Sequence, residues 1–204
     1  NAAGNAWEQV CGQLNGQTYI LGLAVYNGRL YGGTYNGGCL FRLNAAGNAW
    51  EQVCGQLNSQ TYINALAVYD DRLCGGTTPG GLLFRLNVAG NAWEQICAQL
   101  NGQTYIYSLA VCNERLYGST NPGGRLFRAT ETAGKWSQVA AQLNSQTSIL
   151  SLAAYNNEVY GGTEPSGCLF KYNSTTYAWE QVCAHLGQGL IYSLAVYNGR
   201  LYGG

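Results

Sequence analysis

Histidine is the side chain that most often transfers protons in enzymes, and this sequence contains one, His185. A Ser-His-Asp or Cys-His arrangement also needs supporting groups around the imidazole, and no motif near His185 supplies them. Two carboxylates converging on one pocket could instead hydrolyse a glycosidic bond. Glutamate recurs at one position of a repeated segment, but on what we expect to be solvated outer strands. We therefore predict no enzymatic activity. The recurring glutamates are Glu8, Glu51, Glu94 and Glu180.

The eight cysteines are the other reactive residues. They form no CxxC pair, and a single histidine cannot complete a zinc site, so the sequence predicts no metal and no cofactor. Cysteines, low charge and the sequon Asn173-Ser174-Thr175 together favour an extracellular or cell-surface protein. Asn173 is then the expected glycosylation site.

Charge is scarce along the whole chain of 204 residues. Charged residues make up 10% and the formal net charge is zero, whereas about 25% is usual for a globular protein. Without a basic excess to neutralise phosphates, nucleic acid is not an expected partner. No apolar run reaches about 18 residues, so we expect no membrane insertion.

The elements that position these side chains come from an internal repeat of 43 residues, marked by tryptophan. The segment LAVYNGRLYGG at 23–33 returns unchanged at 194–204. Each unit reads as four short strands, and Asn27-Gly28 is a strong signal for a type I′ hairpin. Four antiparallel strands in about 40–50 residues are typical of a propeller blade. The spaced tryptophans are Trp7, Trp50, Trp93, Trp136 and Trp179.

We therefore predict an all-β protein, a single five-bladed β-propeller over residues 1–204. Its blades are four-stranded and antiparallel, and the fifth blade lacks one strand. The repeats span residues 1–43, 44–86, 87–129, 130–172 and, incompletely, 173–204.

The fourth unit resembles the kelch repeat. It has two glycines after an aromatic strand, then an aromatic-basic strand, then tryptophan: Tyr160-Gly161-Gly162, Lys171-Tyr172-Asn173 and Trp179. The resemblance implies a propeller and says little about function. The units are shorter than typical kelch units and are similar in length to those of tachylectin-like five-blade lectins, a likeness of architecture only.

The fifth blade is where the chain leaves its repeat unfinished. The sequence begins with what we expect to be a fourth strand, Trp7–Cys11, and ends after a second strand at Gly203-Gly204. Closing the ring would leave an empty lane that another chain's strand could fill, although a segment taken from a longer array would look the same. The first interpretation predicts assembly with further copies through Trp7, Cys11, Leu201, Tyr202, Gly203 and Gly204.

Two pairs of cysteines stand symmetrically about the outer turns of their units. Cys39 and Cys54 are expected opposite one another on adjacent strands, and Cys168 and Cys183 hold the same positions in another blade. We predict two cross-strand disulfides, within the usual Cα separation of about 4.4–6.8 Å.

Four further cysteines have no such symmetry. Cys74 and Cys112 each replace a tyrosine on neighbouring blades, and we predict a third, inter-blade disulfide between them. Cys97 is expected to be a buried free thiol. Cys11 is either free or bonded to another molecule.

Loops on one face of the predicted propeller present amides and tyrosines with little charge. Such side chains suit neutral sugars, which need stacking surfaces and hydrogen bonds. The function that we expect is therefore a non-enzymatic extracellular structural or adhesive protein that binds further copies of itself, and the alternative is a lectin for neutral glycans with repeated shallow sites. The candidate ligand residues are Gln17, Tyr19, Tyr35, Gln60, Tyr62, Gln103, Tyr105 and Tyr107.

Overall fold

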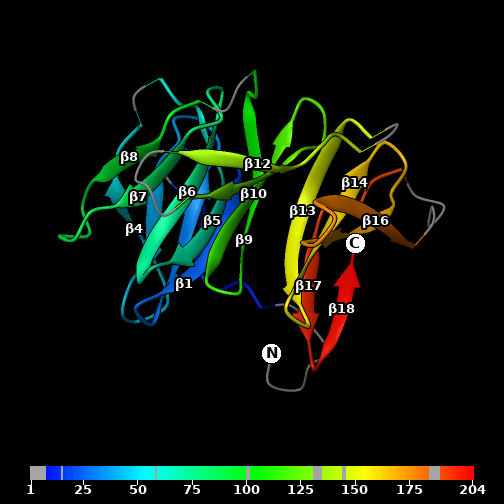
Figure 1. The fold of residues 1–204 in the computed structure, drawn as a ribbon. Coiled ribbons are helices and arrows are strands. Elements are labelled where there is room, and N and C mark those ends of the chain that lie inside the picture. Colours follow the sequence, from blue (N-terminus) through cyan, green and yellow to red (C-terminus); the bar gives the residue numbers. More distant parts are fainter. Residues whose placement is uncertain are drawn as a thin grey trace.

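The computed structural model describes residues 8–14, 16–57, 59–99, 102–130, 135–143, 146–183 and 189–204, and this part of the chain is all strand and loop (Figure 1). It contains no helix that could cross a membrane. Blade 1 comprises β1 (Ile20–Tyr26), β2 (Arg29–Thr34), β3 (Leu40–Leu43) and β4 (Trp50–Cys54). Blade 2 comprises β5 (Tyr62–Tyr69), β6 (Arg72–Thr78), β7 (Leu83–Leu86) and β8 (Trp93–Cys97). Blade 3 comprises β9 (Tyr105–Cys112), β10 (Arg115–Asn121), β11 (Leu126–Ala129) and β12 (Trp136–Ala140). Blade 4 comprises β13 (Ser148–Tyr155), β14 (Glu158–Glu164), β15 (Leu169–Asn173) and β16 (Ala178–Cys183). Blade 5 comprises β17 (Leu194–Tyr197) and β18 (Arg200–Gly203).

Blades 1 to 4 are four-stranded antiparallel sheets with their strands in chain order, and blade 5 is a two-stranded hairpin. The hairpin follows β13 at one end of the series of sheets, shown in red in Figure 1. The predicted all-β, five-bladed class with an incomplete fifth blade is thereby confirmed. The strand expected at Trp7–Cys11 is not formed: residues 8–11 make no sheet hydrogen bonds and Trp7 lies outside the described residues. Blade 5 accordingly has two strands where the sequence predicted three.

Tight turns between the first two strands of each blade set the register. Asn27 and Gly28 have φ values of 48° and 70°, as a type I′ turn requires, and Tyr26 consequently pairs with Arg29. Asp70 and Asp71 adopt the same left-handed conformation in blade 2 without a glycine.

Each inner strand of blades 1 to 4 carries a β-bulge near its start. In blade 1, Ile20 pairs with Thr34 and Gly22 with Gly33, so one residue between them has no partner in the ladder. A bulge redirects the side chain of the unpaired residue. The residues at this position are Leu21, Asn64, Tyr107 and Leu150.

The repeated glycine pair packs the blades against one another. A Cβ atom on Gly75 would lie 3.1 Å from the ring of Trp93 in the same blade. A Cβ on Gly76 would lie 2.5 Å from the Cγ2 atom of Ile106 in the next blade. The first glycine therefore accommodates the tryptophan, and the second accommodates the isoleucine of the following blade, which is fully buried.

Candidate functional site

The cysteines form no disulfide; all eight are free thiols. The predicted Cys39–Cys54 and Cys168–Cys183 bridges fail because a register shift in each outer hairpin pairs Leu40 with Cys54 and Leu169 with Cys183. The prediction assumed that residues equally distant from the turn face one another, and a register shift cannot be read from the sequence in that way.

The predicted Cys74–Cys112 bridge is absent as well, because the two side chains belong to different core clusters. Burial raises the pKa of Cys74 to about 12, and burial followed by the nearby Cys39 raises the pKa of Cys54 to about 11. Thiols with such pKa values are poor nucleophiles at neutral pH.

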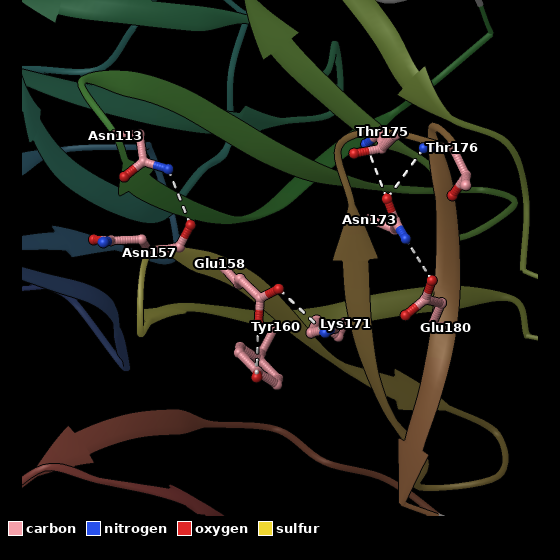
Figure 2. Close-up of polar contacts among 9 residues, drawn as sticks. All are labelled: Asn113, Asn157, Glu158, Tyr160, Lys171, Asn173, Thr175, Thr176 and Glu180. Carbon is pink, nitrogen blue, oxygen red and sulfur yellow. Dashed lines mark hydrogen bonds and ion pairs between the residues drawn. The ribbon is translucent and has the colours of Figure 1, made fainter.

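Three glutamates form ion pairs with basic side chains of their own blades. Glu51 forms an ion pair with Arg42 at 3.0 Å, and Glu94 forms one with Arg85 at 3.5 Å. Glu158 binds Lys171 at 3.1 Å and accepts a hydrogen bond from the hydroxyl of Tyr160 (Figure 2). Among the described residues no three His, Cys, Asp or Glu side chains are grouped as metal ligands would be. His185 lies outside the described residues.

Asn173, the expected glycosylation site, lies at the end of β15. Its amide nitrogen donates to the carboxylate of Glu180, and its amide oxygen accepts from the backbone N–H groups of Thr175 and Thr176 (Figure 2). The side chain thus stabilises the turn that follows the strand. Glycosylation at this site remains a prediction.

Two of the glutamines that we predicted to bind a ligand are buried and hydrogen-bonded within the chain. The amide oxygen of Gln60 accepts hydrogen bonds from the Thr77 hydroxyl at 2.7 Å and from the Gly80 N–H at 3.2 Å, and the residue is 4% exposed. Gln103 is 1% exposed and accepts from the Thr120 hydroxyl. Both side chains hold a connecting loop to the second strand of their blade, and neither faces a ligand.

The candidate tyrosines fall into two clusters. Tyr35 stacks on Tyr62 of the next blade with ring centroids 4.3 Å apart, and Tyr19 meets Tyr35 edge-on at 5.5 Å. The hydrogen bond between Tyr35 and Tyr62 raises the pKa of Tyr35. In blade 3, Tyr105 stacks on Tyr107 at 5.1 Å.

Gln17 lies beside the first tyrosine cluster. It lines a cavity of ≈ 340 Å³ together with Tyr19, Ile20 and Trp50. This cavity opens at the side of blade 1 that has no preceding blade.

The side of blade 1 that faces away from blade 2 is uncovered. Ile20 is 39% exposed, whereas the isoleucines at the same repeat position in blades 2, 3 and 4 are 0% exposed. Leu23 is 57% exposed, whereas the corresponding Leu66 is 8% exposed. Val25 continues the apolar surface at 67% exposure. We call Ile20, Leu23 and Val25 the blade 1 face.

The far side of blade 5 is uncovered too. Tyr202 is 50% exposed, against 5% for the corresponding Tyr31, and Tyr197 is 67% exposed. Gly204 occupies the repeat position of Gly76, yet among the described residues a Cβ there would meet only Ser193 of its own blade. We call Tyr197, Tyr202 and Gly204 the blade 5 face.

Sequence reasoning found the residues of these two exposed faces only in part. Tyr202 and Gly204 were candidates, together with Leu201 and Gly203, because they border the incomplete blade. Ile20 and Leu23 were not singled out, because isoleucine and leucine recur at these two positions in every blade. Of the other two assembly candidates, Cys11 is a half-buried free thiol and Trp7 lies outside the described residues.

Comparison with known proteins supports the fold. No protein-family model matches the chain, so the kelch resemblance rests on its residues alone. No curated protein matches it significantly. Two similar solved structures are named as the extracellular domain of BT4673 from B. thetaiotaomicron, described in one case as a hybrid two-component system and in the other as a one-component system. Each is 24% identical with a TM-score of 0.66, and each match covers 92% of this chain but 25% of the other. This chain therefore spans about a quarter of their length.

Proposed function

We propose that this chain is a non-enzymatic, extracellular propeller domain that assembles with further copies of itself through the blade 1 face and the blade 5 face. The observation that carries the proposal is that both halves of one inter-blade interface are present and uncovered. Inside the molecule, the isoleucine of blades 2, 3 and 5 packs on the glycine of the preceding blade, as Ile106 does on Gly76, whereas blade 3 has Ser119 at the glycine position. Ile20 and Gly204 are the unused isoleucine and glycine of the same pairing.

The two faces are complementary and different, which makes the contact head-to-tail. Such contacts join copies into rings or into open chains, according to whether the rotation closes. A formal net charge of zero means that copies do not repel one another. In blades 1 to 4 the second strand pairs with a third strand. The corresponding edge of β18, the second strand of blade 5, offers additional backbone hydrogen bonds to a neighbouring chain.

The remaining parts of the proposal rest on the side-chain inventory. Paired carboxylates and high-pKa thiols favour a domain without catalysis. The sequon at Asn173 and the low charge favour an extracellular location. The solved structures of similar fold are extracellular domains by name, which agrees with that location.

Light scattering over a range of protein concentrations tests assembly. We expect a mass that rises with concentration, and a monomeric mass for the variant Val25→Glu. Val88→Glu is the matched control, because Val88 is also an exposed valine, at 83%, and lies outside both faces. A wild-type mass of one chain at every concentration would overturn the proposal, because it would mean that the two faces close on each other or stay free.

Neutral glycan binding is the second candidate function, and the Tyr19–Tyr35–Tyr62 cluster favours it. Two stacked rings beside an edge-on third offer the apolar surface against which a sugar ring packs. Binding on a glycan array that disappears in Tyr35→Thr would support it, since threonine holds this repeat position in blade 2. An array without signal above background would end it.

A further inference from the structure

The repeats differ from one another at many positions, and two of these lie close together at the start of the inner strands. The framework around them is constant: Thr34, Thr77, Thr120 and Thr163 each close the loop after the second strand with the same hydroxyl hydrogen bond. The bulge position, by contrast, changes from blade to blade. Its residues are Leu21, Asn64, Tyr107, Leu150 and Tyr192.

The residue that follows each of those threonines is the second variable position, at the end of the second strand. It is aromatic in blade 1, polar in blades 2 and 3, and acidic in blade 4. Its residues are Tyr35, Thr78, Asn121 and Glu164. A constant backbone that carries different side chains at two neighbouring positions gives each blade a surface of its own, and blades 3 and 4 combine aromatic rings with a carboxylate.

Hydrogen bonds and strand pairing connect that carboxylate to the blade 3 rings. Tyr105 pairs with Asn121 in the ladder between β9 and β10. The amide of Asn121 donates to the Ser148 hydroxyl of blade 4 at 2.7 Å. Ser148 in turn pairs with Glu164. The stacked rings of Tyr105 and Tyr107 therefore lie on the same edge of the molecule as Glu164.

Tyr107 is the centre of this group. Burial raises its pKa, and the next contributions come from Tyr105, Glu164 and Tyr192, so these three groups lie within electrostatic reach of its hydroxyl. Tyr192 is 68% exposed. Glu164 is half-buried, and none of the ion pairs in the described part of the chain involves it.

We propose that Tyr105, Tyr107, Tyr192 and Glu164 form a binding site for a small alkylated ammonium ion. Tyrosine rings attract such a cation through their negative faces, and its methyl groups pack on the same rings. A carboxylate without a cationic partner supplies the balancing charge. The Tyr19–Tyr35–Tyr62 cluster has no acidic residue at the equivalent position, so it lacks the feature that would select a cation.

Choline is the probe, titrated into the full chain at low salt and followed by calorimetry. Its neutral isostere, 3,3-dimethyl-1-butanol, has the same shape with carbon in place of nitrogen. We expect choline to bind and the isostere to bind about two- to thirtyfold more weakly. Added sodium chloride weakens choline binding, because it screens the carboxylate.

The repeat supplies variants that its own fold already accommodates. Tyr107→Leu installs the residue found at Leu21 and Leu150, and Glu164→Thr installs the residue found at Thr78. Each is expected to weaken choline binding about two- to thirtyfold while the chain remains folded. Tyr177→Asn is the matched control: Tyr177 is exposed on an outer turn, and Asn48 and Asn91 hold that position in other blades.

Three outcomes would overturn the proposal: no saturable binding at millimolar choline, equal affinity for choline and its isostere, or equal weakening by Tyr177→Asn. The site is independent of assembly between copies. Light scattering of Tyr107→Leu and Glu164→Thr distinguishes choline binding from assembly. Both variants should keep the wild-type mass whether or not they bind choline.

Discussion

Ile106 and Ile20 occupy the same position of the repeat in two different environments, and truncating each to alanine measures what covers the blade 1 face. Ile106 is 0% exposed and packs on the bare backbone of Gly76, which cannot move in to fill a void. Ile→Ala removes three carbon atoms, about 2.4 kcal/mol of transfer free energy at about 0.8 kcal/mol each. With the cavity that remains, we expect Ile106→Ala to lower the free energy of unfolding by about 3–4 kcal/mol.

Ile20 is 39% exposed, and solvent enters the space that its side chain leaves. Only part of the transfer free energy is then lost and no cavity forms, so Ile20→Ala should cost about 1.5 kcal/mol or less. The assay is urea denaturation at a concentration where light scattering finds one chain, with thermal unfolding as a second readout. For a chain of this size the two variants should differ in Tm by roughly 5 °C.

The comparison also has a refuting result. If Ile20→Ala costs as much as Ile106→Ala in the monomer, the blade 1 face is covered within a single chain and the reasoning on open faces is wrong. If the cost of Ile20→Ala rises with protein concentration, neighbouring copies cover the face, as proposed.

Three further predictions concern the framework. Gln60→Ala leaves the Thr77 hydroxyl and the Gly80 N–H without their shared acceptor, and should lower the free energy of unfolding by about 1–3 kcal/mol in denaturant titrations; an unchanged value would refute the fastening role. Asp71→Gly relieves a left-handed φ of 52° and should raise stability by about 1 kcal/mol, whereas the same change at Asp70 tests whether the first turn position behaves alike. The pKa of Cys74 is raised from 9.0 to about 12, so the folded chain retains a proton that the unfolded chain loses; stability is full below about pH 9 and falls as the pH rises toward 12, and Cys74→Ala should reduce that slope.

The sequence predicted the blades well because their signals are local. Asn27-Gly28 fixes a hairpin by itself, and the 43-residue repeat extends that assignment to other blades. The glycine pair and the tryptophan marked the repeat in the sequence, and their packing role is visible only in the contacts of Gly75 and Gly76.

Features that depend on a partner or on register could not be predicted in the same way. Residues 8–11 have a strand-like sequence, but a strand forms only where another strand pairs with it. The Cys39–Cys54 pairing assumed an unbroken register, and a shift between Leu40 and Phe41 changes which side chains are opposed. The open faces were hidden for the opposite reason: the repeat makes Ile20 look identical to its buried counterparts.

The glycine–isoleucine contact between blades has a consequence for how such a protein can evolve. Every blade presents an isoleucine on one side, and blades 1, 2, 4 and 5 present a glycine on the other, where blade 3 has Ser119. Duplication in the gene of a 43-residue unit that has this glycine therefore recreates the same isoleucine–glycine contact. Blade number can then change by whole units while such blades keep their surroundings, and variation accumulates at side chains outside that contact, such as those at the bulges.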